Sequence, residues 1–444
     1  MTEKRVESEK RESPQVPGIT RITVAGFKSI SEEQSIEIRP LTILAGVNSS
    51  GKSSIMQPLL LLKQTLEATY DPGPLLLNGP NVKFTSVDQL LSYMGRGGHG
   101  GTFHVGTGVG SSTLMLRFEQ TSKGLEIQEM IWMSAEGGIP LRPEMTRDEI
   151  ISAIPASLRS LPPMLSAQGE WAVMRNRCFL EVRLRAKDGQ ESHLPFRFSP
   201  GMVVEPYIRQ VIHLPGLRGN PERTYPVTAV GLAFPGTFEK YAASVIAQWQ
   251  ADEQQDCLRG LNGDLKRLNL TWKVESKRID DTQVELQVGR LVRAARGGSR
   301  DLVNIADVGF GVSQSLPVLV ALHAAQPGQL VYLEQPEIHL HPRAQFVLAQ
   351  VLADAAARGV RVVAETHSSL LLLGVQALVA EGKLAPELVK LHWFERGDDG
   401  VTRVTSADLD ETGAFGDWPE DFAQVDLEAQ SRYLDATELR QVKV

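Results

Sequence analysis

Residues 46–53 of this chain read GVNSSGKS and match the phosphate-binding pattern GxxxxGK[ST]. The apolar run Leu41–Ala45 before them fits a buried strand, and a helix is expected from Lys52 to about Ala68. In that order, glycines let loop amides point inward and the helix N-terminus favours phosphate. Lys52 would reach the β- and γ-phosphates of ATP, and the Ser53 hydroxyl would ligate Mg²⁺. The predicted nucleotide-binding residues here are Gly46, Asn48, Ser49, Ser50, Gly51, Lys52, Ser53 and Ser54.

The composition is that of an ordinary globular protein of roughly two or three structural units. The chain has 444 residues, of which 42% are apolar and 22% charged, and this excludes a mostly disordered protein. Its formal charge of -7 means that any contact with nucleic acid must come from a local patch. The longest apolar run, Leu370–Ala380, is far short of the ~20 residues that span a bilayer, so no membrane association is expected. Two cysteines, Cys178 and Cys257, are too few for a disulfide framework and fit a cytoplasmic location.

Changes in charge, apolar periodicity and turn residues along the chain predict five regions. Residues 1–17 mix charges without apolar periodicity and read as a solvated tail. Residues 18–95 hold the first part of a nucleotide-binding domain, and 96–300 a middle lobe of antiparallel strands with a helical insertion. Residues 301–394 hold the second part of that domain. Residues 395–444 contain 13 acids against five bases and read as an acidic tail.

The region after residue 300 alternates strands and helices. A helix is expected from about Val312, strands over Gln329–Glu334 and Val360–Glu365, and a helix that ends at Arg358 between the two strands. Strands joined by helices in this way predict a parallel sheet.

Three segments of that region resemble the motifs of ABC-class ATPases. Residues 330–342 (LVYLEQPEIHLHP) resemble the Walker B strand and the loop that follows it, and residues 364–368 (AETHS) resemble the switch-histidine segment. Residues 307–314 (DVGFGVSQ), just before Walker B, resemble the ABC signature. The three matches occur in the order that the ABC class requires.

Together with residues 26–29 (GFKS), these segments resemble stand-alone bacterial AAA/ABC-class ATPases related to the OLD (overcoming lysogenization defect), SMC and RecF ATPases. The resemblance covers residues 19–92 and 302–394. It implies an α/β fold in which an ABC-class P-loop ATPase domain, with a mostly parallel sheet and an antiparallel lobe, is interrupted by a long mixed α+β middle insertion. Residues 216–223 (GLRGNPER) and 415–419 (FGDWP) also look familiar from this family, without a known chemistry.

By this resemblance, two subunits would sandwich two ATP molecules, each held by the P-loop of one subunit and the signature of the other. Gly309 and Gly311 would allow close approach, and Ser313 at a helix N-terminus would meet the γ-phosphate. His367 would sense that phosphate, although it could instead be a buried histidine at a strand end. Glu365 would project on the same face of the strand as His367.

Two positions depart from the usual pattern and predict slow hydrolysis. Glu334 replaces the usual Walker B aspartate and could still hold Mg²⁺. Gln335 replaces the usual catalytic glutamate, and an amide cannot accept the proton of an attacking water. Glu337 could supply the base, or it could be a loop carboxylate that orients the chain. The predicted catalytic residues are therefore Lys52, Gln335, Glu337 and His367, and the predicted metal ligands are Ser53 and Glu334.

Two further groups of residues allow a metal-site interpretation. His339 and His341, with Glu337, have the spacing of a small zinc cluster, but loop packing or a subunit contact is favoured. Asp398–Asp399 and Asp408–Asp410 resemble the acidic pairs of a TOPRIM nuclease, yet too little chain follows for that domain. We interpret them as solvated turns.

The leading functional hypothesis is an ATP-dependent dimerisation switch that acts in defence against phage or in DNA maintenance, through a separate nuclease or effector protein. A homodimer or larger assembly would close on ATP. The alternatives are a nuclease that acts alone and, less favoured, a transporter ATPase subunit. Nucleic acid could bind the middle lobe through four arginines, unless these belong to a solvated turn: Arg290, Arg293, Arg296 and Arg300.

Overall fold

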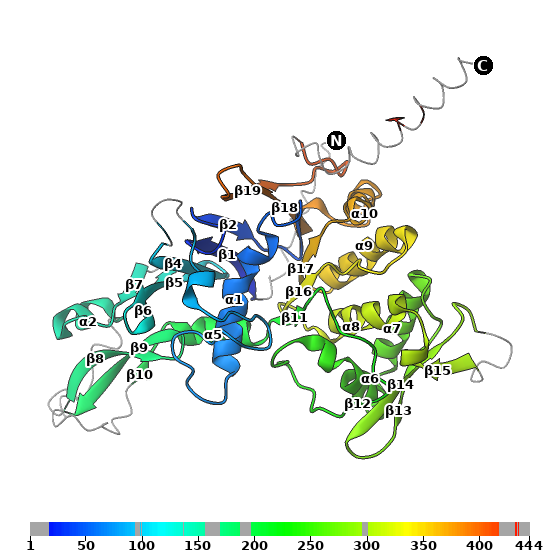
Figure 1. The fold of residues 1–444 in the computed structure, drawn as a ribbon, viewed down its shortest axis with the longest axis horizontal. Coiled ribbons are helices and arrows are strands. Elements are labelled where there is room, and N and C mark those ends of the chain that lie inside the picture. Colours follow the sequence, from blue (N-terminus) through cyan, green and yellow to red (C-terminus); the bar gives the residue numbers. More distant parts are fainter. Residues whose placement is uncertain are drawn as a thin grey trace, which may run out of the picture.

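Two six-stranded sheets form the centre of the computed structural model of this chain, and two smaller sheets extend from it (Figure 1). One central sheet is mostly parallel and the other is antiparallel. This is the predicted α/β fold with a parallel sheet and an antiparallel lobe. The structure describes residues 17–93, 98, 100–135, 137–155, 169–186, 197–294, 301–416, 431, 432 and 434.

The parallel sheet has the strand order β11-β16-β17-β3-β18-β19. Its neighbours run parallel, except that β19 is antiparallel to β18. The three strands predicted around the P-loop and the ABC motifs are confirmed as β3, β16 and β17. The bounds are Leu41–Gly46 for β3, Ile212–Leu214 for β11, Leu330–Glu334 for β16, Arg361–Thr366 for β17, Val389–Arg396 for β18 and Thr402–Ala407 for β19.

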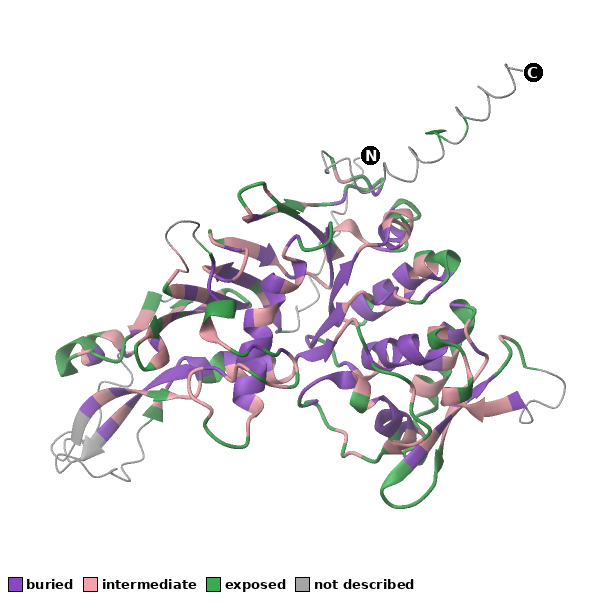
Figure 2. Cartoon of the chain, in the orientation of Figure 1, coloured by how far each residue is buried: buried purple, intermediate pink, exposed green. Residues whose placement is uncertain are grey.

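Helices cover both faces of the parallel sheet, which is why its central strands β3, β16 and β17 are almost entirely buried. Ile43 packs in one hydrophobic cluster with residues of α8, α9 and α10, while the next residue, Leu44, packs with α1 and the antiparallel sheet. Figure 2 shows this burial along the central strands and on the helices beside them. The bounds are Lys52–Glu67 for α1, Phe310–Ala324 for α8, Pro342–Ala357 for α9 and Ser369–Ala380 for α10.

The antiparallel sheet has the order β2-β1-β4-β5-β6-β7 and lies on the side of α1. Strands β8 to β10 form a three-stranded arm that continues outward from it (Figure 1). The bounds are Ile19–Ala25 for β1, Gln34–Glu37 for β2, Thr102–Val109 for β4, Ser112–Thr121 for β5, Gly124–Ser134 for β6, Gly137–Leu141 for β7, Arg147–Ala153 for α2, Gly169–Asn176 for β8, Phe179–Ala186 for β9 and Arg197–Phe198 for β10.

Beyond β11 the chain enters a lobe of helices and a fourth sheet, in which β14 pairs with β12, β13 and β15. Helices α6 and α7 pack here against α8. The bounds are Gly201–Arg209 for α5, Tyr225–Pro226 for β12, Ala242–Ala251 for α6, Gln255–Arg267 for α7, Val274–Arg278 for β13, Gln283–Gly289 for β14 and Leu302–Asn304 for β15.

The region borders expected from sequence differ from the sheets of the structure. Residues 96–300 separate β3 from β16 in sequence, as the middle insertion predicts, but they also supply β4 to the sheet of β1 and β11 to the parallel sheet. The tail expected at 395–444 starts inside β18 and contains β19. Which strands pair is decided by contacts between segments far apart in the sequence, and the local residue pattern does not reveal these contacts. The expected tail at 1–17 lies outside the described residues apart from its last residue.

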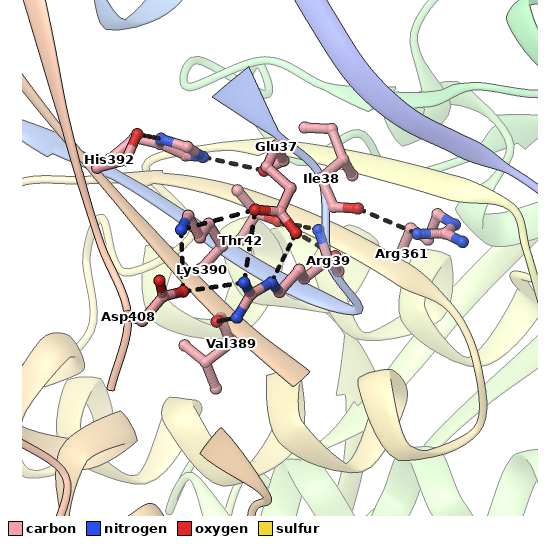
Figure 3. Close-up of polar contacts among 10 residues, drawn as sticks. Glu37, Ile38, Arg39, Thr42, Arg361, Val389, Lys390, His392 and Asp408 are labelled. Atoms are coloured by element: carbon pink, nitrogen blue, oxygen red, sulfur yellow. Dashed lines mark hydrogen bonds and ion pairs between the residues drawn. The ribbon is translucent and has the colours of Figure 1, made fainter. Parts of the chain in front are cut away.

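A polar cluster ties the C-terminal strands β18 and β19 to the end of β2 (Figure 3). Arg39 bonds Glu37 and Asp408, and Lys390 lies 2.9 Å from the same Asp408 carboxylate. The His392 ring nitrogen Nε2 lies 2.9 Å from the Glu37 carbonyl oxygen. Burial lowers the pKa of His392 to about 4, so this histidine is neutral near pH 7.

Among the described helices, none combines the length and the apolar character that crossing a membrane requires.

Candidate nucleotide-binding site

The P-loop follows β3 and leads directly into α1, as the sequence predicts. Phe394 of β18 lies so close that a Cβ on Gly46 would meet its carbonyl oxygen at 2.2 Å, with Gly46 at φ 147°. No side chain caps the first turn of α1, which starts at Lys52. The amides of that turn are therefore available to an anion, and the helix dipole favours one.

Lys52 turns back onto its own loop. Its Nζ donates to the carbonyl oxygens of Gly46 at 2.9 Å and Val47 at 2.8 Å, and the residue is buried. Burial lowers the pKa of Lys52, an effect that the negative charges of Glu365 and Glu337 oppose. Because burial disfavours the charged ammonium, a further anion beside Lys52 would stabilise it.

Ser53 bonds a carboxylate that the sequence motifs did not assign to it. Its Oγ donates to the Glu365 carboxylate, at 2.9 Å from each oxygen, and the Tyr332 hydroxyl donates to the same carboxylate at 2.8 Å. Burial raises the pKa of Glu365, and the hydrogen bonds that it accepts only partly oppose this. The half-buried Ser53 hydroxyl and the buried Glu365 carboxylate thus lie together beside the P-loop, as two oxygen groups that could ligate a metal ion.

The predicted metal ligand Glu334 is bonded on the other side, toward β11. Its carboxylate lies 3.1 Å from His213 Nε2 and accepts the amide of Gly216 at 3.1 Å. Burial alone would raise the pKa of Glu334, but these bonds and a nearby arginine lower it below the usual value. The Glu334 carboxylate is therefore ionised and held in place. Glu334 pairs in register with Glu365 of the adjacent strand β17.

The three remaining predicted catalytic residues lie in the turns after β16 and β17. Gln335 has φ 45°, and its backbone N–H donates to the Glu365 carbonyl oxygen at 2.8 Å. Glu337 is buried and accepts the Thr366 hydroxyl at 2.6 Å and the His367 amide at 3.0 Å. These two bonds tie one oxygen of Glu337 to the switch segment, while its other oxygen is buried without a hydrogen-bond partner among the described residues. Burial, together with the charge of Lys52, lowers the pKa of His367.

A cavity of about 750 Å³ brings most of these residues together. It lies within the usual size of a small-molecule site. Asn48 to Ser54 line it with Gln335, Glu365 and His367, whereas Glu334 and Glu337 are not among its lining residues. Ten further lining residues were not expected as site residues from sequence: Lys28, Ser29, Gln57, Asp88, Gln89, Leu91, Tyr93, Arg396, Asp399 and Gly400. Three of the ten stood out in the sequence: Lys28 and Ser29 belong to the GFKS segment, and Asp399 belongs to an acidic pair that was interpreted as a solvated turn.

The signature residues lie elsewhere, at the N-terminus of α8. Gly309 precedes the helix with open space where its Cβ would be, and the Ser313 hydroxyl bonds the Phe310 carbonyl oxygen at 3.2 Å. Phe310 is 52% exposed, and its ring lies 5.9 Å from that of His339. Gly309, Gly311 and Ser313 are thus not part of the P-loop cavity of their own chain.

The segment at residues 216–223 connects the end of the Walker B strand β16 with the signature helix α8. The buried Arg218 guanidinium donates to the Glu334 carbonyl oxygen at 2.8 Å and to that of Gln314 in α8 at 3.3 Å. Gln314 in turn donates to the Gly219 carbonyl oxygen at 2.6 Å. Burial lowers the pKa of Arg218 to about 10. The end of the Walker B strand and the signature helix are therefore held to one common loop.

The other candidate groups have local roles in the structure. The His341 side chain caps α9 by accepting the Arg343 amide, and Asp399 pairs with Arg403 at 2.5 Å. Over the described ranges, no group of three His, Cys, Asp or Glu residues is placed to hold a metal ion.

The predicted basic patch is only partly visible. Arg290 lies 3.4 Å from the Asp301 carboxylate, so the positive charge of this member of the patch is partly compensated. Arg296 and Arg300 lie outside the described residues.

The P-loop and the strands β16 and β17 are joined in one mostly parallel sheet beside an antiparallel lobe, which is the α/β arrangement that the resemblance to ABC-class P-loop ATPases implied. Residues 234–373 match the family model described as "AAA domain, putative AbiEii toxin, Type IV TA system". This match includes the signature, Walker B and switch segments, and the P-loop lies outside it. No curated protein matches the chain.

Solved structures of SMC head domains are similar to the chain at low identity. The SMC head domain from Thermotoga maritima has 10% identity and a TM-score of 0.36, and the comparison covers 87% of this chain and 98% of that one. The Smc head domain with an extended coiled coil from Pyrococcus furiosus, bound to the C-terminal domain of ScpA, has 11% identity and a TM-score of 0.46, covering 95% and 100%. At these values the likeness supports no conclusion about function.

Proposed function

We propose that this chain binds ATP with Mg²⁺, hydrolyses it slowly and acts as a nucleotide-dependent dimerisation switch. The observation that carries the proposal is the single cavity that gathers the P-loop, Glu365, Gln335 and His367. Loop amides, a lysine and a helix N-terminus make one end of this cavity suited to a triphosphate.

Phosphate binding would use groups that are now bonded to the protein itself. Lys52 would exchange the carbonyl oxygens of Gly46 and Val47 for phosphate oxygens, which is favourable because its ammonium is buried. His367 lies at the same cavity and would donate a hydrogen bond to the terminal phosphate.

The oxygen donors beside the loop fit a magnesium ion. Ser53 and Glu365 offer a hydroxyl and a carboxylate, which are the hard ligands that Mg²⁺ prefers, and Glu334 would act through water. Mg²⁺, when bound, would neutralise phosphate charge. A cation here would also favour the ionised form of Glu365, whose pKa burial raises.

Slow turnover is inferred from the carboxylates around Gln335. The Gln335 amide positions water but does not take its proton. Glu365 lines the cavity and already accepts Ser53 and Tyr332. Glu337 accepts Thr366 and the His367 amide through one oxygen and is not among the residues that line the cavity. A water molecule would therefore lack a dedicated general base, and ATP would remain bound for long periods.

Dimerisation is supported by the separation between the signature and the cavity of the same chain. Ser313 and its helix start would complete the cavity of a second copy, where the helix dipole favours a phosphate. Two exposed apolar side chains, Phe310 at 52% and Leu217 at 86%, would be covered in such an assembly. Arg218 would connect the two sites of one subunit, because it bonds both the Walker B strand and the signature helix.

The wider role that we propose is defence against phage or DNA maintenance through a separate effector. The description of the matching family names a putative toxin of a type IV toxin–antitoxin system, which accords with a defence role. The alternative, a nuclease that acts alone, needs a cluster of carboxylates for its metals, and a metal-dependent cleavage assay on the pure chain separates the two.

The proposed site is tested by calorimetric titration with ATP and Mg²⁺. Lys52→Ala should abolish the binding heat while the far-UV circular dichroism spectrum stays unchanged. Lys83→Ala, which removes an exposed lysine outside the cavity, is the matched control and should bind like the wild type. Undiminished binding by Lys52→Ala would refute the site.

A further inference from the structure

The hairpin of β18 and β19 forms one wall of the P-loop cavity. Arg396, Asp399 and Gly400, at the turn of this hairpin, are among the lining residues. The hairpin follows the family match, which ends at residue 373, and sequence composition had suggested only an acidic tail here. Neither the family match nor the composition predicted that this hairpin borders the P-loop cavity.

Thr402, the first residue of β19, bonds the P-loop directly. Its amide donates to the Ser29 carbonyl oxygen at 2.7 Å, and its hydroxyl lies 2.8 Å from both the Ser50 carbonyl oxygen and the Ser29 hydroxyl. Thr402 is fully buried, with 0% of its surface exposed. The two hydroxyls and the Ser50 carbonyl thus form a short chain of bonds, which is buried at Thr402 and Ser50 and reaches the cavity at Ser29.

This contact lies beside Gly51, where the P-loop has little free space. Gly51 has φ 100°, and a Cβ at this position would meet the Thr402 hydroxyl at 2.4 Å. Glycine is required here for the left-handed backbone and also for the approach of Thr402. The next residue is Lys52, so the hairpin fixes the peptide from which the phosphate-binding lysine and α1 begin.

The hairpin is itself anchored, so it can serve as a rigid support. Strand β18 pairs with β3 along its length, up to Phe394 beside Gly46. At the other end, Lys390 and Arg39 both pair with Asp408, which follows β19 (Figure 3). Movement of Thr402 away from the loop would disturb both sets of contacts.

We propose that Thr402 is a positioning residue for nucleotide binding, which holds Ser50 and Gly51 of the P-loop in the shape that accepts phosphate. The inference rests on the proposed function, since it concerns the same site. The hairpin thereby makes ATP affinity depend on the C-terminal part of the chain, although Thr402 itself does not touch the nucleotide.

The test compares variants of Thr402 with a variant of the same strand. Thr402→Val keeps the branched shape and removes the hydroxyl, and one buried hydrogen bond lost should weaken ATP affinity and raise KM by about tenfold, with kcat nearly unchanged. Thr402→Ser keeps the hydroxyl and should restore affinity to within about twofold. Thr405→Val, at an exposed position of β19, is the matched control and should bind like the wild type.

A second measurement, hydrogen–deuterium exchange without nucleotide, separates this inference from the proposed function. Thr402→Val should speed exchange of the amides of residues 47–52, and Thr405→Val should not. This result is expected even if the wild type binds no ATP. If Thr402→Val folds poorly, Ser29→Ala removes the other hydroxyl and should produce the same faster exchange. Unchanged loop exchange and unchanged ATP affinity in these variants would overturn the role of Thr402.

Discussion

Glutamate in place of Gln335 should convert a slow ATPase into a faster one. The new carboxylate would stand where the cavity now has the Gln335 side-chain amide, directly after Glu334 in sequence and in the same cavity as Glu365. Glutamine and glutamate have the same shape, so the left-handed backbone at φ 45° costs the same in both. The substitution therefore changes the chemistry of one group and leaves the loop as it is.

The magnitude of the effect depends on the charges around this position. Like charges raise a carboxyl pKa, and the Glu334 carboxylate, with its lowered pKa, is a fixed anion nearby. The new glutamate should thus titrate closer to neutral pH, where a general base is most effective, and such bases are typically worth ~10²–10⁴-fold. We expect hydrolysis about 10²-fold faster, with a rate that rises with pH because the base must be deprotonated.

Phosphate release at saturating ATP and Mg²⁺ measures this rate, and calorimetry confirms that binding is intact. Gln255→Glu makes the same change of charge on the exposed start of α7, outside the cavity, and should leave the rate unaltered. A Gln335→Glu variant that binds ATP but hydrolyses it no faster than the wild type would refute the missing-base explanation.

Three further outcomes follow from the contacts of single residues. Glu337→Gln keeps an oxygen for Thr366 and the His367 amide, so its kcat should stay within about threefold of the wild type, and a collapse of turnover with binding intact would identify Glu337 as the base. Glu365→Gln should still accept Ser53 but lose its charge, so that ATP titrations need about tenfold more Mg²⁺. His392 has a folded-state pKa of about 4 against about 6.5 when unfolded, so the unfolded chain takes up a proton first as pH falls. Its contribution to stability should drop by about 2 kcal/mol between pH 7.5 and pH 5, and urea unfolding of His392→Gln should show a flatter pH dependence than the wild type.

The parts of the fold that local pattern specifies were predictable. The run Leu41–Ala45 became β3, and the helix expected to end at Arg358 ends at Ala357 as α9. The P-loop motif also placed Lys52 and Ser53 correctly at the start of a helix. Apolar periodicity and glycine position are properties of a short window, so a single sequence reveals them.

The partner of Ser53 could not be predicted in the same way. The motifs assigned Ser53 and Glu334 to the same Mg²⁺, but β17 lies between β3 and β16, and this order brings Glu365 to Ser53. Strand order is set by long-range pairing, which motif spacing does not contain. The contact between Thr402 and Ser50 joins residues 352 positions apart, and the acidic composition around Thr402 concealed a buried strand end.

The most direct test of the ATP-dependent switch is sedimentation velocity of the full chain with Mg²⁺ and a slowly hydrolysed ATP analogue. We expect the analogue to convert the wild type into a species of about twice the mass, through the signature of one copy and the P-loop of the other. Lys52→Ala should not respond because it does not bind, and Ser313→Arg should bind the analogue without assembling. Sedimentation that is unchanged in a wild type saturated with analogue, or a Ser313→Arg variant that assembles like the wild type, would contradict the switch.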